Sequence, residues 1–186
     1  MLVGALVGLV AAFVLSVDAV ELAANPDAAL ACDVNAVISC GTVGTSWQAS
    51  LFGFPNAFLG LVAESVVITV AVAGLAGVRF PRWFMTAAQT VYLLGFVFAY
   101  WLLWQSMFVI GALCPWCLTI TVSTTLVLAS MLHWNILEDT LYWPARLQSW
   151  AMSLVRSGAF GILTAAWFAL LVAAVLLKYG DALFAG

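Results

Sequence analysis

Four cysteines are the residues of this 186-residue sequence whose type and spacing could support chemistry. Cys114 and Cys117 form a Cys-Pro-Trp-Cys motif, and Cys32 and Cys40 form a second pair earlier in the chain. A Cys-x-x-Cys pair at the start of a helix suits redox chemistry, because the free N–H groups and the helix dipole stabilise a thiolate. Pro115 fits the first turn of such a helix. The two pairs therefore predict thiol–disulfide exchange.

Two other interpretations of the cysteines stay open. Zinc also binds Cys-x-x-Cys motifs and needs four ligands, which Cys32 and Cys40 could complete. Their spacing is poor for zinc, and the single histidine, His133, is expected at the opposite end of its helix, so we expect no metal. The second alternative is two inert disulfides in a non-catalytic membrane scaffold.

The composition places these cysteines in a membrane protein. Hydrophobic residues make up 66% of the chain and charged residues 7%, whereas soluble domains carry about 25% charged residues. The apolar runs do not alternate with polar residues as the strands of a β-barrel do. Helices satisfy their own backbone hydrogen bonds in lipid, so we expect an all-α membrane protein forming a single domain over residues 1–186. The chain has no basic patch, which argues against a nucleic-acid partner.

Five apolar runs are long enough to cross the bilayer, which takes roughly 20 residues. The first run could instead be a cleaved signal peptide, but no Lys or Arg precedes it, so we expect a retained helix. Its abrupt apolar start suggests that a natural polar N-terminus has been trimmed. The expected spans are residues 2–20, 55–78, 83–111, 115–132 and 160–177, with a loop over residues 22–54 that carries Cys32 and Cys40.

The basic residues predict how these spans are oriented. The loop over residues 22–54 has no Lys or Arg, and positive residues favour the cytoplasmic side. We therefore expect a cytoplasmic N-terminus and all four cysteines on the extracytoplasmic side of a bacterial plasma membrane, where disulfides persist. Lys178 alone opposes this orientation. Four of the five basic residues lie in the two connections expected inside: Arg79, Arg82, Arg146 and Arg156.

Three motifs together resemble the vitamin K epoxide reductase family. They are Cys-Asp-Val-Asn-Ala-Val-Ile-Ser-Cys at 32–40, Phe-Gly-Phe-Pro-Asn at 52–56 and Cys-Pro-Trp-Cys-Leu-Thr at 114–119. The resemblance covers roughly residues 32–125 and, more loosely, the first span. DsbB-type proteins use a similar set of four cysteines, but their Cys-x-x-Cys pair comes first in the chain. The reversed order here favours the vitamin K epoxide reductase family.

The resemblance implies a four-helix bundle around a quinone, with a fifth transmembrane helix alongside. It implies that Cys117 is the thiolate facing the quinone and that Cys114 is its partner in the active-site disulfide. Cys40 would pass electrons to Cys114, and Cys32 would face the external redox partner. Asn56 would hydrogen-bond a quinone carbonyl, although a helix cap is the alternative role for this residue.

The remaining implications concern the ligand and the partner. The electron acceptor would be menaquinone, phylloquinone or ubiquinone, and the apolar wall residues of its pocket would be Phe58, Leu61 and Leu118. The electron donor would be a separate thioredoxin-like (DsbA-type) protein, because no second Cys-x-x-Cys motif is present. Thr121 stands where animal members of the family carry Tyr, which places epoxide reduction in more doubt than quinone reduction.

Several further residues near these motifs carry expectations of their own. Trp47 is expected at the membrane surface or over the quinone pocket. Gly41 and Gly44 are expected to let the loop bend. Glu64, the one charge deep in a span, is expected to be a neutral acid bonded to Gln89 or Ser65, with a proton relay as the alternative.

Overall fold

The computed structural model describes residues 1–35 and 37–184, and these residues are predominantly helical. Within them, five helices are long and apolar enough to cross a membrane, which confirms an all-α membrane protein. They are α1 (Leu2–Ala24), α3 (Ala57–Leu75), α4 (Arg82–Gln105) with the π-turn η2 (Ser106–Ile110), α5 (Pro115–Leu137) and α7 (Ala159–Phe184). Three shorter helices are α2 (Cys40–Gly44), η1 (Trp47–Ser50) and α6 (Ala145–Arg156).

The helices differ from the expected spans mainly at their ends. α1 continues past the expected residue 20 to Ala24, and α5 continues past residue 132 to Leu137. α3 is shorter than expected and ends at Leu75. The expected limits follow the apolar runs alone, whereas a helix can continue into a polar environment as long as its backbone hydrogen bonds continue.

The described chain forms two compact units. The first unit comprises residues 1–78 and 94–127, and the second comprises residues 79–93 and 128–186, so α4 and α5 contribute to both. All four cysteines belong to the first unit, which contains no Lys, Arg or His. Thiolates in this unit therefore have no cationic side chain of their own unit to stabilise them.

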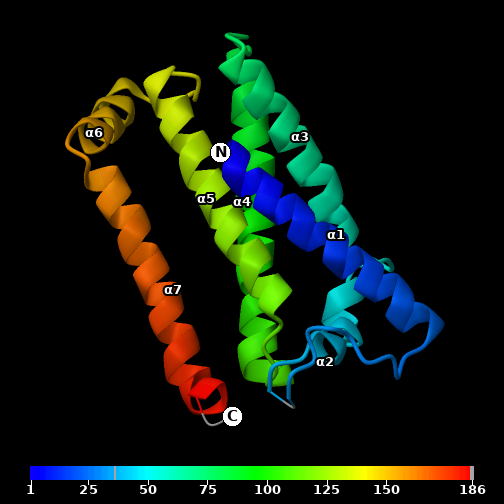
Figure 1. Ribbon diagram of the computed structural model, residues 1–186. Coiled ribbons are helices and arrows are strands. Elements are labelled where there is room, and N and C mark those ends of the chain that lie inside the picture. The colour runs from blue at the N-terminus through cyan, green and yellow to red at the C-terminus, as the bar shows by residue number, and fades with distance from the viewer. Residues whose placement is uncertain (36, 185–186) are drawn as a thin grey trace. The chain divides into compact units, whose positions relative to one another are not determined.

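Helix α1 packs closely along α3 in the first unit (Figure 1). Small residues allow the two backbones to approach, as is common between membrane helices. Ala12 of α1 is fully buried, and a Cβ added at Gly60 of α3 would lie 2.9 Å from the Ala12 Cβ. A Cβ added at Gly8 would lie 3.0 Å from both Glu64 of α3 and Ser123 of α5. The missing side chains of these glycines therefore allow α1 to pack closely against α3 and α5.

Replacing Gly60 with leucine should destabilise the first unit by about 2–3 kcal/mol, because the added side chain would force α1 away from α3. The matched control is Gly95→Leu in α4, where a Cβ meets nothing within 4 Å. Thermal unfolding in detergent measures both variants, and we expect a lowered midpoint for the Gly60 variant only. Equal midpoints for the two variants would contradict the close helix contact.

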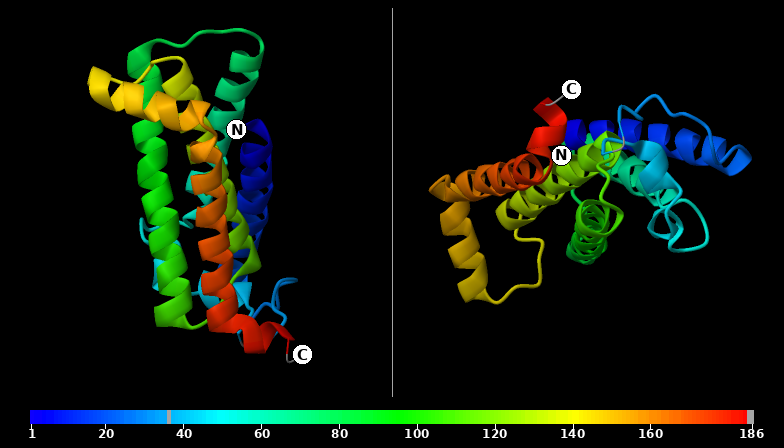
Figure 2. Two further views of the ribbon diagram at one scale, coloured as in Figure 1. Left: turned by 90° about the vertical axis from the view of Figure 1, so that its left-hand side faces the viewer. Right: turned by 90° about the horizontal axis from the view of Figure 1, so that it is seen from below.

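The second unit joins the two connections that carry the arginines. Arg82 donates a hydrogen bond to the Leu141 carbonyl at 2.7 Å, and its guanidinium lies 4.9 Å from the centre of the Tyr142 ring. Asn135 donates to Gln89 Oε1 and accepts from the Thr140 hydroxyl. Helix α6 runs across the direction of α7 (Figure 2). The α3–α4 and α5–α6 connections therefore lie together at one end of this unit.

Candidate redox site

The loop between α1 and α3 is fixed by one aspartate. The Asp33 carboxylate accepts hydrogen bonds from the Leu30 N–H at 3.0 Å, the Ser39 hydroxyl at 2.8 Å and the Gly41 N–H at 2.9 Å. Ser39 in turn caps α2 by accepting from the Thr42 N–H. Burial alone would raise the pKa of Asp33, but these hydrogen bonds together lower it. The charged carboxylate therefore holds the two loop cysteines in one compact turn.

Backbone hydrogen bonds connect the loop to the turn before α5, where the second cysteine pair begins. η2 ends at Gly111, whose φ of 78° is in the left-handed region that favours glycine. The chain that follows forms a short parallel bridge between Leu113 and Ile38. The Leu113 N–H donates to the Val37 carbonyl at 2.7 Å, and the Ser39 N–H donates to the Leu113 carbonyl at 3.1 Å. Cys114 directly follows Leu113, and Cys40 lies two residues after Ile38. The bridge therefore brings these two cysteines close to each other.

The four sulfur atoms form one cluster in two redox states. Cys32 and Cys40 form a disulfide, whereas Cys114 and Cys117 are free thiols. Cys114 Sγ lies 3.4 Å from Cys40 Sγ, which is contact distance for two sulfurs. Cys40 is 2% exposed and Cys114 1% exposed, but Cys32 and Cys117 are only half-buried. The two inner sulfurs can therefore exchange with each other, while the residues Cys32 and Cys117 are each partly exposed.

The start of α5 stabilises a thiolate at Cys114. The hydrogen bond from the Cys117 thiol lowers the pKa of Cys114, and burial opposes it. The N–H groups of Cys117 and Trp116 lower the pKa further, with the Cys117 nitrogen 3.3 Å from Cys114 Sγ. Helix N–H groups thus supply the stabilisation that cationic side chains supply elsewhere. The motif predicted a stabilised thiolate, and the family resemblance placed the quinone-facing thiolate at Cys117, whereas the N–H groups at the helix start act on Cys114. The role of Cys117 stays a prediction.

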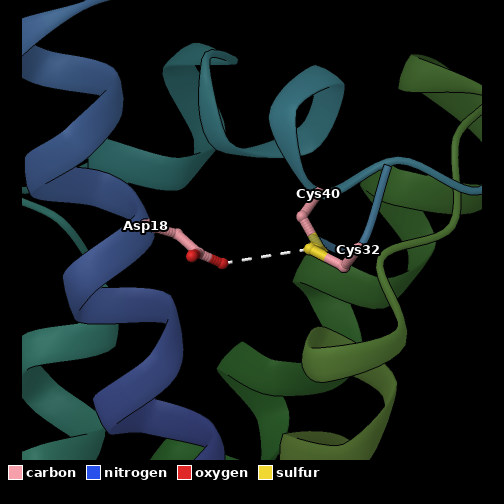
Figure 3. Close-up of side chains that lie close together, drawn as sticks. All are labelled: Asp18, Cys32 and Cys40. Atoms are coloured by element: carbon pink, nitrogen blue, oxygen red, sulfur yellow. Dashed lines mark hydrogen bonds between the residues drawn. A yellow bond between two sulfur atoms is a disulfide. The ribbon is translucent and has the colours of Figure 1, made fainter. Parts of the chain in front are cut away.

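Asp18 of α1 lies against the loop disulfide (Figure 3). Its Oδ2 atom is 3.9 Å from Cys32 Sγ. Asp18, Cys32 and Cys40 place their ligand atoms within 4.8 Å of one another, a spacing that would suit a metal ion. In the structure the two sulfurs are bonded to each other, so neither is the thiolate that a metal requires. The arrangement therefore fits redox chemistry better than zinc binding.

Asn56 lies at the start of α3 but makes no capping hydrogen bond. Its Nδ2 donates instead to the Gln48 backbone carbonyl at 2.6 Å, while its Oδ1 is buried and finds no hydrogen-bond partner among the described residues. Gln48 is itself buried, and its side chain reaches Gln105 Oε1 at 3.4 Å. A buried amide oxygen without a partner is costly, and a bound polar ligand would satisfy it.

The family comparison decides which kind of protein this is. A model of the vitamin K epoxide reductase family matches residues 1–132, and no curated protein matches the chain. The chain belongs to the vitamin K epoxide reductase family. It is therefore an oxidoreductase that links disulfide chemistry to a quinone-type electron partner. The matched region contains all four cysteines and Asn56, and it ends before α6 and α7.

The aromatic residues of the family's α1–α3 loop pack against α4. Trp47 lies 6.3 Å from Trp101, and Phe52 lies 5.6 Å from Phe98, measured between ring centres. Trp47 is 64% exposed, which fits its expected position at a membrane surface and leaves the pocket-cover alternative open. η1 therefore contacts α4 through Trp47 and Gln48, and Phe52, which follows η1, contacts α4 as well.

One of the three expected wall residues lines the apolar groove that the described residues form. Leu118 lines a shallow apolar groove of about 250 Å³ with Val3 and Val7 of α1. Phe58 and Leu61 lie half-buried on α3, outside this groove. Their roles in a quinone pocket stay predictions.

Other expected residues acquire structural reasons. Gly41 and Gly44 permit close packing, because an added Cβ would lie 3.0 Å from Asp33 Oδ2 and 2.8 Å from Leu22 Cδ1 respectively. Glu64 is buried, and a Cβ added at Gly8 would lie 3.0 Å from it. Gln89, one of its two expected partners, accepts a hydrogen bond from Asn135. The sequence argument missed Asp18, Asp33 and Gln48. A charge near the end of an apolar span was the signal for Asp18.

Replacing Asp33 with asparagine should loosen the loop by about 1 kcal/mol, a modest value because the carboxylate is exposed. Hydrogen–deuterium exchange at the amides of Leu30 and Gly41 measures this loss. In the wild type, the lowered pKa means that the stabilisation is present above the unfolded pKa of about 3.9. It should disappear as the pH falls through the lower folded pKa. The exposed Asp27→Asn variant is the control, and equal exchange in both variants would contradict the role of Asp33.

Proposed function

We propose that this protein passes electrons from an external thioredoxin-like protein, through Cys32–Cys40 and then Cys114–Cys117, to a membrane quinone. The observation that carries this proposal is the 3.4 Å contact between Cys40 and Cys114. The burial pattern supports the donor side, because Cys40 and Cys114 are buried residues and Cys32 is half-buried. The partly exposed Cys32 is suited to exchange with the donor, which leaves Cys117 to face the acceptor.

The steps follow from thiolate attack on disulfides. A partner thiolate attacks Cys32, forms a mixed disulfide with it and releases Cys40 as a thiolate. Cys40 then attacks Cys114 of the oxidised second pair, which breaks the Cys114–Cys117 bond and leaves the electron pair on Cys117. The second thiol of the partner releases Cys32, and Cys32 displaces Cys114 from Cys40. Both sulfurs of the second pair are then reduced, as they are in the structure.

The quinone accepts the electron pair from the second cysteine pair and two protons, and menaquinone, phylloquinone and ubiquinone all have this chemistry. The buried and unpartnered Oδ1 of Asn56 supports a polar ligand at the start of α3. This oxygen can accept a hydrogen bond from a quinol hydroxyl, and the second hydrogen on Nδ2 can be donated to a quinone carbonyl. Because Thr121 replaces the tyrosine of animal members, we propose quinone rather than epoxide as the substrate.

We further propose that the N-terminus is cytoplasmic and that the cysteines lie on the extracytoplasmic side. The two arginine-bearing connections lie together in the second unit through the bond between Arg82 and Leu141. A shared position is what the preference of positive residues for the cytoplasmic side requires. The electron donor would then be a separate DsbA-type protein in an oxidising compartment.

The test is quinone reduction by the purified protein in detergent. Dithiothreitol serves as the donor, menaquinone as the acceptor, and optical absorbance follows the reaction. We expect turnover in the untreated protein and none after all thiols have been reduced and alkylated. A non-catalytic scaffold is the alternative, and it predicts that both disulfides resist the dithiol and that no tested quinone is reduced. That result would overturn the proposal.

A further inference from the structure

Thiol exchange at the loop pair needs a proton acceptor for Cys32. A thiol attacks a disulfide only as its thiolate, and an unperturbed cysteine is mostly protonated at neutral pH. In the proposed relay, the partner expels Cys32 as a thiolate, and a Cys32 that has taken up a proton must ionise again before it displaces Cys114 from Cys40. The first unit has no Lys, Arg or His to stabilise that thiolate or to take its proton. Carboxylates are therefore the candidate bases near the loop.

Among these carboxylates, the geometry selects Asp18. Its Oδ2 atom lies 3.9 Å from Cys32 Sγ, within hydrogen-bond reach of a reduced thiol (Figure 3). Asp33 already accepts three hydrogen bonds that fix the loop, so it is not free to take this proton. Glu21 lies one turn further along α1 and is exposed. Glu21 and Asp33 both interact electrostatically with the Asp18 carboxylate. Asp18 also interacts electrostatically with Cys114.

We propose that the Asp18 carboxylate accepts the proton of the reduced Cys32 thiol when Cys32 attacks Cys40. This inference rests on the proposed relay. The proton moves from Cys32 Sγ to Asp18 Oδ2, and the resulting thiolate attacks Cys40 Sγ in the mixed disulfide between Cys40 and Cys114. The Cys32–Cys40 bond forms, the Cys40–Cys114 bond breaks, and the electron pair leaves on Cys114. Asp18 then releases the proton to water.

The structure has the sulfur arrangement that this step produces. Cys32 is bonded to Cys40, Cys114 is reduced at 3.4 Å, and Asp18 remains beside the sulfur that lost its proton. The thiolate released at Cys114 is received by the N–H groups at the start of α5. The proton acceptor Asp18 therefore lies beside the attacking sulfur of Cys32, and the N–H groups at the start of α5 lie beside the leaving sulfur of Cys114.

The experiment measures the mixed disulfide directly. Wild type, Asp18→Asn, Asp18→Glu and the exposed control Glu21→Gln turn over a reduced thioredoxin-like protein, which must enter at Cys32, and menaquinone between pH 6 and 9. Each reaction is stopped with acid, alkylated, and analysed by mass spectrometry for the peptide that links Cys40 to Cys114. For Asp18→Asn at pH 7, we expect about a tenfold lower turnover and several-fold more mixed disulfide. The deficit should shrink toward pH 9, where cysteine ionises without a base.

The Asp18→Glu and Glu21→Gln variants should keep the wild-type pH profile, which a merely structural role would not predict. The inference is overturned if Asp18→Asn lowers turnover equally at every pH without accumulating the mixed disulfide. Wild-type rates in Asp18→Asn would overturn it as well. If Asp18→Asn does not fold, loss of the pH profile in Asp18→Glu would overturn it, and retention would support it. A wild type that neither turns over nor forms the mixed disulfide would instead refute the relay itself.

Discussion

Replacing Cys117 with alanine should lower quinone reduction by about 1,000-fold or more with every electron donor, as expected when the reacting group of a covalent relay is removed. Replacing Cys40 with alanine should have a selective effect. With a thioredoxin-like protein as the donor, the rate of quinone reduction should fall at least about 100-fold. This donor reaches the half-buried Cys32 and not Cys114, which is 1% exposed. Dithiothreitol is small enough to attack the second pair without the loop cysteines, and the rate with this donor should stay within about tenfold of wild type.

The comparison of donors makes this prediction specific to a two-pair relay. Quinone absorbance gives the rates, and alkylation with mass spectrometry verifies that the Cys40→Ala protein still forms the Cys114–Cys117 disulfide. If both donors fail equally with Cys40→Ala, the loop pair is needed for folding rather than for electron transfer. If the protein donor still works at the wild-type rate, Cys40 does not lie on the electron path.

The transmembrane architecture was predictable because lipid imposes it. A bilayer requires about 20 apolar residues per helix, and each such run in the sequence corresponds to a helix in the described chain. The start of α5 was predictable for a local reason, because Pro115 fixes the backbone at a first helical turn. The helix ends were less predictable, since α1 and α5 continue beyond their apolar runs.

The contacts that assemble the redox site depend on the tertiary path of the loop. Asp18 precedes Cys32 by 14 residues, and nothing in their spacing shows that the chain turns back to bring them together. The same is true of the bridge between Ile38 and Leu113, which places Cys40 beside Cys114. The residue types predicted four reacting sulfurs, and the resemblance implied transfer from Cys40 to Cys114; the folded loop places these two sulfurs in contact.

The glycines after Cys40 have a packing role that their residue type alone does not show, and the bending expected of them stays a prediction. Gly41 and Gly44 suggested a flexible hinge, because glycine has a wide conformational range. In the structure both lie in the short helix α2, and neither has a positive φ. Their missing side chains leave room for Asp33 and Leu22. Steric crowding of this kind depends on partners distant in sequence and cannot be inferred from a loop motif.

Asn56 should prove to be the residue whose loss separates quinone binding from thiol exchange. Its Oδ1 is buried without a partner, so the free protein carries a cost that a polar ligand at the start of α3 would remove. Asn56→Ala should therefore lower kcat/KM for menaquinone by about 10- to 100-fold, the equivalent of one or two hydrogen bonds to a bound ligand. Exchange between the cysteine pairs should be unchanged, because the contacts that carry it, Cys40 to Cys114 and Asp18 to Cys32, do not involve Asn56.

The control for this prediction is Asn25→Ala, which removes an exposed side chain that accepts only from the Asp27 N–H among the described contacts. The donor bond from Asn56 to the Gln48 carbonyl is lost in Asn56→Ala, so a structural effect must be separated from a binding effect. A structural effect would slow quinone reduction and thiol exchange together, because η1 and the loop before it would shift. A binding effect would raise KM for the quinone and leave the distribution of disulfides under dithiothreitol alone unchanged, and that is the outcome we expect.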